Sequence, residues 1–290
     1  MILITGCAGY IGSELCKKFS ILNINYVGID NLSYSYEKNI FDKKKFIKCC
    51  ISNKKKISSI IKKFEIKTII HAAAFAYVND AEINKKKYYI NNVLKTKKFI
   101  SIVAKYNIKQ FFFLSSSNIY SKNKNKFFET DMPNPKNYYG KTKLIIEKFL
   151  STKKVDFANV IILRLFNIIG LTKKFKPKNI KDFKYQRLLF KIYFNINKKI
   201  PISLNFYKKM SKVIFPTRDF LDITDLTNLL IKLLKSKQKK SLNIFNVGKG
   251  KSCSLDKIIK TIELIRNRKL LIRYKKLPDN EYQNTLASIK

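Results

Sequence analysis

The chain has 290 residues, of which 46% are hydrophobic and 13% aromatic, which is enough for a core and excludes a wholly disordered chain or a disulfide-stapled miniprotein. Its formal net charge of +42 comes from 61 basic and 19 acidic residues and favours contact with anions. Because no run of about 18 uncharged apolar residues occurs and no basic and apolar leader precedes the first apolar run, we expect neither a membrane span nor a secretory signal.

The first 170 residues alternate β-branched or aromatic runs with amphipathic stretches. Apolar residues recur at helical spacing in stretches that begin near Ile11, Ile57, Phe99 and Leu144. The alternation predicts an α/β fold with a doubly wound parallel sheet. The predicted strands are Ile2–Thr5, Tyr26–Asp30, Lys45–Lys48, Thr68–His71, Gln110–Ser115 and Asn159–Phe166.

After residue 170 the pattern loosens, which predicts a smaller C-terminal lobe at the carboxyl edge of the sheet. We expect a basic loop over Lys173–Lys184 and helices over Gln186–Asn197 and Ser254–Ile265. The predicted domains are therefore 1–170 and 171–290, with part of the chain around 213–248 returning to the first.

A glycine-rich turn, Thr5–Gly12, joins the first predicted strand to the first helix. Gly6 allows a tight turn, Gly9 lets backbone N–H groups approach a pyrophosphate, and Gly12 permits close helix packing. The helix N-terminus adds a positive dipole for phosphates. Asp30 ends the second strand, where a carboxylate accepts hydrogen bonds from ribose hydroxyls and repels a 2′-phosphate, so NAD is favoured over NADP.

Tyr139 and Lys143 form a YxxxK motif at the start of a predicted helix. Residues four apart share a helix face, and an ammonium beside a phenol lowers the pKa of the tyrosine toward working pH. In so lysine-rich a chain the motif gains weight only from the serines Ser115–Ser117, which follow the apolar run Phe111–Leu114 at the end of a strand. A hydroxyl there can hydrogen-bond a reacting substrate oxygen.

Neither the positive charge nor the cysteines point to a specific binding site. Only six of the 61 basic residues are arginines, the residue preferred for bidentate phosphate contacts, and the lysines are scattered, so we expect no nucleic-acid partner. The five cysteines form no CxxC motif, and the single histidine, His71, cannot complete a Cys/His metal site of the usual spacing with them. We expect free thiols, no metal and a cytoplasmic location.

The ordered motifs resemble those of the extended short-chain dehydrogenase/reductases over nearly the whole chain. Within that family the chain is most similar to the nucleotide-sugar 4-epimerases of the UDP-glucose 4-epimerase group. The resemblance implies a Rossmann-type domain that holds NAD and a C-terminal lobe that mainly holds a UDP-sugar. It is carried by Thr5–Gly12, Asp30–Leu32, His71–Ala73, Tyr89–Val93, Ser115–Ser116 with Tyr120, Tyr139 with Lys143, Arg164 with Phe166–Asn167, Arg218–Phe220 and Phe245–Gly248.

The resemblance also implies roles for single residues. Ser116, Tyr139 and Lys143 would be catalytic, with Tyr139 removing the 4-OH proton as the sugar becomes a transient 4-keto intermediate. The activity would be that of an isomerase that interconverts UDP-glucose and UDP-galactose. Implied cofactor positions are Gly6, Gly9, Tyr10, Ile11, Gly12, Asp30, Asn31, Leu32, Ser33, Ser35, Cys50, Ile51, Ala72, Ala73, Ala74, Asn91, Ser115, Tyr139, Lys143 and Phe166. Implied substrate positions are Ser116, Ser117, Tyr139, Asn167, Arg218 and Asp279.

Several departures from the family pattern accompany the resemblance. Cys50 stands where relatives usually have an acid for the adenine amine, and Lys276–Asp279 replaces an Arg-x-Gly-Asp pattern. Dehydratase relatives place an Asp-Glu pair where this chain has Ser117 and Asn118, neither of which is an acid at neutral pH, so epimerisation is favoured. A homodimer through helices around 92–106 and 139–152 is implied as well.

The identity of the sugar stays open at this point. UDP-N-acetylglucosamine is one alternative substrate, and an epimerase or decarboxylase of UDP-glucuronate on the same scaffold is another. A degenerate, non-catalytic member that binds nucleic acid through the +42 charge is the alternative from a different class.

Overall fold

A computed structural model describes residues 1–121, 124–152, 157–170, 192, 195–196, 200–236, 241–279 and 281–289. Its centre is a seven-stranded sheet in which every neighbouring pair of strands is parallel. In spatial order the strands are β11 (Leu242–Val247), β6 (Asn159–Leu165), β5 (Gln110–Ser116), β4 (Thr68–His71), β1 (Ile2–Thr5), β2 (Tyr26–Asp30) and β3 (Phe46–Lys48).

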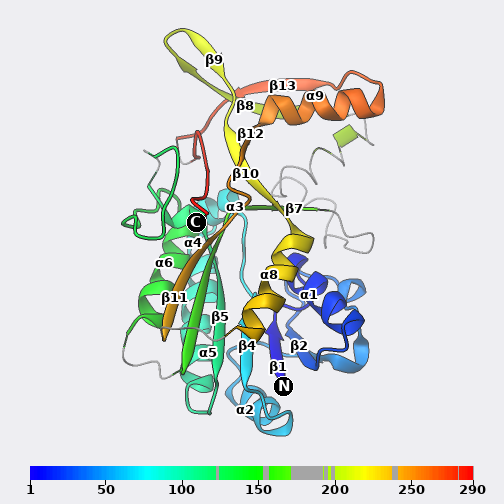
Figure 1. Ribbon diagram of the computed structural model, residues 1–290, viewed down its shortest axis with the longest axis vertical. Helices are drawn as coiled ribbons and strands as arrows, with labels where there is room; N and C mark the ends of the chain where they lie inside the picture. The colour runs from blue at the N-terminus through cyan, green and yellow to red at the C-terminus, as the bar shows by residue number, and fades with distance from the viewer. Residues whose placement is uncertain are drawn as a thin grey trace.

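Helices cover both faces of this sheet (Figure 1). Within the ranges given above, the α-helices are α1 (Tyr10–Ile21), α2 (Lys54–Lys63), α3 (Val78–Ile83), α4 (Lys85–Tyr88), α5 (Lys95–Val103), α6 (Tyr138–Leu150), α8 (Ile223–Lys235) and α9 (Leu255–Arg266). Short 3-10 turns are η1 (Glu37–Asn39), η2 (Lys43–Lys45) and η4 (Ser117–Ile119), and a π-helical turn, η3 (Tyr89–Leu94), leads into α5.

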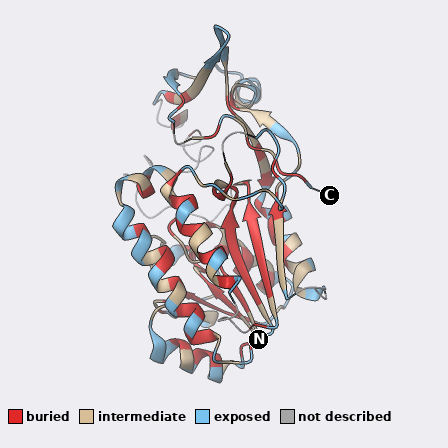
Figure 2. Cartoon of the chain, turned by 90° about the vertical axis from the view of Figure 1, so that its left-hand side faces the viewer, coloured by how far each residue is buried: buried red, intermediate tan, exposed pale blue. Residues whose placement is uncertain are grey.

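Alternate residues of the strands supply two separate cores. Leu3, Ile69 and Phe111 face α2, α5 and α6, whereas Ile4 and Ile70 face α1 and α8. Since successive strand side chains point to opposite faces, a sheet covered on both sides needs nearly continuous apolar runs, as these strands have. Figure 2 shows the resulting band of buried strands between more exposed helices.

The C-terminal lobe lies beyond the carboxyl ends of the sheet strands (Figure 1). One three-stranded sheet joins β12 (Ser252–Ser254), β10 (Thr217–Asp222) and β7 (Asn167–Ile169). A second joins β13 (Ile272–Lys276), β8 (Ile202–Lys209) and β9 (Lys212–Ile214). From β10 the chain runs into α8 and then β11, so residues of the lobe and of the central sheet alternate along the sequence. The domain limits expected above stay a prediction.

The segment 281–289 ties the lobe to the central sheet domain. Its Tyr282 hydroxyl shares its hydrogen between the carbonyl oxygens of Asn118 (3.0 Å) and Tyr120 (2.7 Å), and its backbone bridges to Phe127 and Thr217. The carboxylate of Asp219 on β10 accepts a hydrogen bond from the backbone N–H of Ala287 (3.0 Å). This segment therefore contacts both parts of the molecule.

The predicted fold class is confirmed: the six expected strands are present with ends shifted by at most one residue, and the helix expected over Ser254–Ile265 is α9. The basic loop lies outside the described residues, as does most of the helix expected over Gln186–Asn197. Within the described part of the chain, no helix is both long and apolar enough to cross a membrane.

Candidate active site

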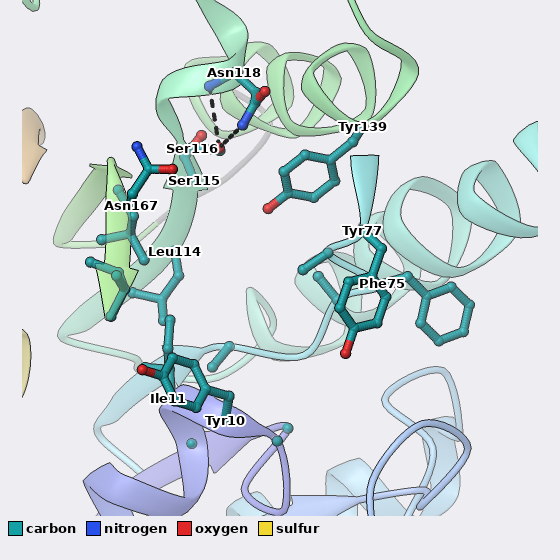
Figure 3. Close-up of a pocket in the computed structure, with 18 of the residues that line it drawn as sticks. Tyr10, Ile11, Phe75, Tyr77, Leu114, Ser115, Ser116, Asn118, Tyr139 and Asn167 are labelled. Atoms are coloured by element: carbon teal, nitrogen blue, oxygen red, sulfur yellow. Dashed lines mark hydrogen bonds between the residues drawn. The ribbon is translucent and has the colours of Figure 1, made fainter. Parts of the chain in front are cut away.

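A cleft of about 550 Å³ opens at the carboxyl ends of the sheet strands, beneath the C-terminal lobe. It runs from the glycine turn at Gly6 and Gly9 to Ser116, Tyr139 and Lys143, and we call it the main cleft (Figure 3). A smaller hollow of about 80 Å³, the adenosine-side hollow, adjoins it and contains Asp30 and Cys50. The two share the lining residues Gly6, Gly9, Tyr34, Ser35, Ala72, Ala74 and Phe75, so they lie directly side by side.

The glycine turn is held closed by contacts that admit no side chain. Gly6 has φ +70°, and a Cβ on it would lie 2.8 Å from the backbone of Ala73. A Cβ on Gly12 would lie 2.1 Å from the carbonyl oxygen of Gly6. The first contact packs the turn against the segment after β4, and the second packs the start of α1 against the turn. The N-terminus of α1 therefore lines the cleft, as an anion site requires.

Asp30 joins the end of β2 to the same turn. One carboxylate oxygen accepts from the N–H of Ala8 at 3.1 Å and the other from the N–H of Leu32 at 2.8 Å. The carboxylate is fixed in the lining of the adenosine-side hollow, which also includes Cys50, whose Sγ lies 3.3 Å from the hydroxyl of Ser52. The hollow thus presents a carboxylate where ribose hydroxyls would need an acceptor, and a thiol group in place of an acid.

Ser116 and Tyr139 line the main cleft from two different elements, β5 and α6. Ser116 ends β5, and its hydroxyl accepts hydrogen bonds from the backbone N–H (3.2 Å) and side-chain amide (3.1 Å) of Asn118. Tyr139 lies in the first turn of α6 with its hydroxyl pointing into the cleft (Figure 3). The Ser116 oxygen accepts two hydrogen bonds from Asn118, which leaves its own hydrogen available to donate toward a ligand.

Lys143 lies one helical turn beyond Tyr139 and is 5% exposed. Its Nζ donates to the carbonyl oxygen of Leu114 (2.7 Å) and lies 4.8 Å from the ring centre of Phe113 and 5.9 Å from that of Tyr139. Burial lowers the pKa of Lys143 to about 7, and the carboxylate of Glu147 acts in the opposite direction. The ammonium is therefore poised to titrate near neutral pH.

His71 ends β4 and is buried behind this group. Its Nδ1 lies 2.9 Å from the hydroxyl of Thr5 and its Nε2 3.3 Å from that of Thr96. Burial, with a smaller contribution from the charge of Lys143, lowers the pKa of His71 to about 3. The ring is therefore neutral and packs beside Phe99. These contacts indicate a structural role for His71.

The main cleft and the adenosine-side hollow bring together most of the residues expected from the sequence. They are Gly6, Gly9, Tyr10, Ile11, Gly12, Asp30, Asn31, Ser33, Ser35, Cys50, Ile51, Ala72, Ala73, Ala74, Asn91, Ser115, Ser116, Tyr139, Lys143, Phe166 and Asn167. Their roles in binding and catalysis stay predictions.

Four expected residues are not among those that line the described cleft or hollow: Leu32, Ser117, Arg218 and Asp279. Arg218 lies 3.8 Å from the carboxylate of Glu281 and donates to the carbonyl oxygens of Thr217 (2.9 Å) and Gln283 (3.3 Å). Asp279 is exposed in the C-terminal lobe. The binding roles expected for these four residues are therefore without support from the described cleft, and they too stay predictions.

Two residues that follow strand ends, Tyr77 and Asn118, were not predicted from the sequence as parts of the site. Tyr77 lies after β4, where it forms one wall of the main cleft with Phe75 (Figure 3). Asn118, which positions the Ser116 hydroxyl, follows β5. Their position after the carboxyl ends of parallel strands is the feature that could have identified them.

The profile of the NAD dependent epimerase/dehydratase family matches residues 2–248 of this chain. The chain belongs to that family. The resemblance stated above and the expectation of NAD are thereby confirmed.

Curated relatives of the chain include a probable UDP-arabinose 4-epimerase of Oryza sativa subsp. japonica, 27% identical over 89% of this chain and 65% of the relative. A UDP-glucose 4-epimerase of Bacillus subtilis is 27% identical over 94% of this chain and 84% of its own length.

The chain thus spans just under two thirds of the length of the rice relative. Among solved structures, the UDP-glucose 4-epimerase of Thermus thermophilus in complex with NAD has a TM-score of 0.84 at 20% identity, over 99% of this chain and 90% of that one. At this identity the likeness concerns the fold, which agrees with the epimerase/dehydratase assignment.

The cleft of this family member fits the cofactor in its chemistry. The glycine turn and the N-terminus of α1 offer backbone donors to a pyrophosphate, and the fixed carboxylate of Asp30 offers acceptors to a ribose. The adenosine-side hollow and the main cleft, side by side, extend from Asp30 past Gly9 to Lys143 and Tyr139. An extended dinucleotide therefore finds a complementary group along each part of this path.

Proposed function

We propose that this chain is a UDP-sugar 4-epimerase, an isomerase that uses NAD, with UDP-glucose and UDP-galactose as its substrate pair. The observation that carries the proposal is that Ser116, Tyr139 and Lys143 line the same cleft as the glycine turn, and that this cleft adjoins the hollow of Asp30. A nucleotide sugar would enter from the side of the C-terminal lobe. NAD, when bound, supplies a reversible two-electron oxidant at C4 of the sugar.

The side chains provide the proton chemistry. Tyr139 Oη takes the proton of the 4-hydroxyl when C4 is oxidised and returns it when C4 is reduced. The ammonium of Lys143, one turn away on α6, stabilises the phenolate form of Tyr139. The Ser116 hydroxyl, fixed by Asn118, donates to the same substrate oxygen and holds it in place. Because C4 is reduced from either face of the 4-keto sugar, both epimers form.

The two residues after Ser116 favour epimerisation over dehydration. Ser117 and Asn118 carry no group that is an acid at neutral pH, and the amide of Asn118 is occupied with Ser116 and Asn137. A 4,6-dehydratase needs an acid and a base for elimination next to the keto group. The described residues of the cleft thus support redox chemistry at one carbon.

The most specific part of the proposal is the identity of the sugar. The relative from rice is named for UDP-arabinose and the one from Bacillus subtilis for UDP-glucose. Purified protein with NAD should be offered UDP-glucose, UDP-arabinose, UDP-N-acetylglucosamine and UDP-glucuronate separately, with products identified by chromatography and NMR. We expect UDP-galactose from UDP-glucose. Release of carbon dioxide from UDP-glucuronate would instead favour a decarboxylase.

The proposed base is tested by Tyr139→Phe. Loss of the phenol should lower kcat by about 10²–10⁴-fold, the range for removal of a general acid–base group. Tyr138→Phe is the matched control, since Tyr138 is the neighbouring residue of α6 and does not line the cleft. Unchanged turnover in the Tyr139 variant would overturn the mechanism, and no product from any of the four UDP-sugars would overturn the function.

The family resemblance adds a homodimer in the cytoplasm to this proposal. The apolar side chain of Leu94, at the start of the predicted interface helix around 92–106, supports the dimer because it is 47% exposed. Light scattering at several protein concentrations should give twice the mass of 34.0 kDa. A single-chain mass throughout would contradict it.

A further inference from the structure

A buried ion pair lies directly behind the residues proposed to be catalytic. Glu147 stands on α6 one turn beyond Lys143, and Arg164 stands on β6. Arg164 Nη2 lies 2.9 Å and its Nε 3.2 Å from Glu147 Oε2, and both side chains are 4% exposed. The other carboxylate oxygen of Glu147 accepts from the hydroxyl of Ser115, the residue before Ser116.

Arg164 also makes hydrogen bonds to groups other than Glu147. Its Nη1 donates to the hydroxyl of Tyr120 (2.9 Å) and to the carbonyl oxygen of Glu129 (3.0 Å). The hydroxyl of Tyr120 donates in turn to Asn246 Oδ1 at 2.6 Å. These contacts fix the guanidinium between β6 and the segments on either side, so the carboxylate of Glu147 has one defined position.

Stability alone is a weak explanation for this pair. Removing two charges from water costs free energy that their attraction offsets only in part, and apolar replacements of buried pairs are often no less stable. The position of the ion pair offers a better explanation for its presence. It contacts Ser115 at the end of β5 and lies one turn from Lys143 along α6, so it touches both elements that carry the proposed catalytic groups.

Several charged and titratable groups surround Lys143. Tyr139 and Glu147 share its helix, His71 approaches from β4, and Arg164 approaches from β6 behind Glu147. His71 is neutral, and the charge of Arg164 is directed at Glu147. Among the described residues around the ammonium, Glu147 is therefore the carboxylate that can favour its charged form.

We propose that Glu147 is a positioning residue of the active site, which keeps the Lys143 ammonium charged beside Tyr139 and fixes the end of β5 that carries Ser116. The inference rests on the proposed roles of these three residues. Burial opposes the charge on Lys143, and the carboxylate of Glu147 acts against that effect. Without the carboxylate, the charged form of Lys143, which stabilises the phenolate of Tyr139 in the proposed mechanism, would persist only to a lower pH.

The test replaces Glu147 by Gln, which keeps the shape and the acceptor for Ser115 and removes the charge. NMR of protein labelled at the lysine Cε carbons follows Lys143, identified as the resonance missing from Lys143→Met. We expect the apparent pKa of Lys143 to fall by about one unit in the Glu147 variant, because a neighbouring opposite charge is worth that much. The alkaline limb of kcat/KM should move to lower pH by the same amount.

Glu82→Gln is the matched control, since Glu82 also contacts α6, where it accepts from the N–H of Tyr138 (2.6 Å). It should leave the titration of Lys143 unchanged. Should Glu147→Gln alone fail to fold, the double variant with Arg164→Met removes both charges and is expected to shift Lys143 in the same direction. An unshifted titration and pH profile in the folded variant would overturn the proposal, whatever its stability. If wild-type protein turned over no UDP-sugar, the NMR titration would still decide this inference.

Discussion

Lys143 is the residue at which burial and the proposed catalytic role conflict most directly. Its pKa is about 7 in the folded chain against an ordinary 10.5, because burial disfavours the ammonium. Between these two values the unfolded chain binds one more proton than the folded chain. The free energy of unfolding should therefore rise with pH across this window, and the penalty for the buried charge should be fully present below pH 7.

The comparison that isolates this effect is wild type against Lys143→Met in urea unfolding from about pH 6 to 10. The difference in the free energy of unfolding should change by at most about 1.4 kcal/mol per pH unit within the window, the value for one proton. Lys148→Met, an exposed lysine of the same helix, should show no such dependence. Parallel curves for wild type and Lys143→Met would contradict a buried, titrating ammonium.

Single residues also show where prediction from sequence ends. Asp30, Tyr139 and Lys143 could be identified because their chemistry depends on local spacing and on position after a strand. Glu147 could not, because a carboxylate on an amphipathic helix is normally solvent-exposed, and its burial depends on Arg164 from a different strand. The adenosine-side hollow was predicted in part: Asp30 was expected at the end of β2, and Cys50, two residues beyond the paired strand β3, was expected from the family resemblance.

At the scale of elements, the start of α6 connects helix stability to the site. Asn137 caps the helix by accepting from the N–H of Gly140 (2.8 Å), and its amide donates to Asn118 Oδ1 (2.8 Å). Asn118 in turn holds the Ser116 hydroxyl. The cap therefore positions two catalytic candidates at once, Tyr139 through the helix and Ser116 through Asn118.

Asn137→Ala should destabilise the chain by about 1 kcal/mol, the usual value for an N-cap, and should also lower kcat. Asn53→Ala is a matched control, because Asn53 caps α2 by accepting from the N–H of Lys56 (3.1 Å) far from the cleft. It should cost similar stability in urea unfolding and leave kcat unchanged. Equal kcat in the two variants would show that the link to Asn118 has no catalytic consequence.

The elements of the sheet were predictable because each strand carries its own apolar run between helices of clear periodicity. The ends of the strands were less predictable. Lys45 belongs to η2, and β5 extends to Ser116 because that residue still pairs with Leu165 on β6. Tyr77 in the wall of the cleft was missed because loop residues follow no period. Their placement depends on tertiary contacts, such as the hydrogen bond from the N–H of Tyr77 to the hydroxyl of Tyr88 (3.2 Å).

At the scale of the whole molecule, the C-terminal segment reaches the site from outside the sheet domain. Tyr282 holds the carbonyl oxygens of Asn118 and Tyr120, and the N–H of Ala287 donates to Asp219. No local pattern predicts such contacts, which join residues more than 60 positions apart. They explain how a lobe built mainly from its own small sheets keeps a defined position over the cleft.

Asp219 is the centre of that connection. Its side chain is fully buried and accepts from the backbone N–H groups of Lys249 (2.7 Å), Gly250 (3.0 Å) and Ala287 (3.0 Å). An amide cannot accept all three, since one of its ends is a donor. Asp219→Asn should therefore lower the free energy of unfolding by at least about 2 kcal/mol, as at least one buried donor loses its acceptor.

The same substitution should reduce kcat by loosening the segment that carries Tyr282, which contacts the loop of Asn118. Asp256→Asn is the control, because Asp256 lies on α9 and its pairing with Lys260 (3.8 Å) is solvent-exposed, where such pairs contribute little. Urea unfolding and kcat measured on both variants separate the two cases. Similar stabilities for the two variants would mean that the carboxylate of Asp219 does not hold the C-terminal segment to the lobe, and the connection would then rest on Tyr282 and the backbone bridges alone.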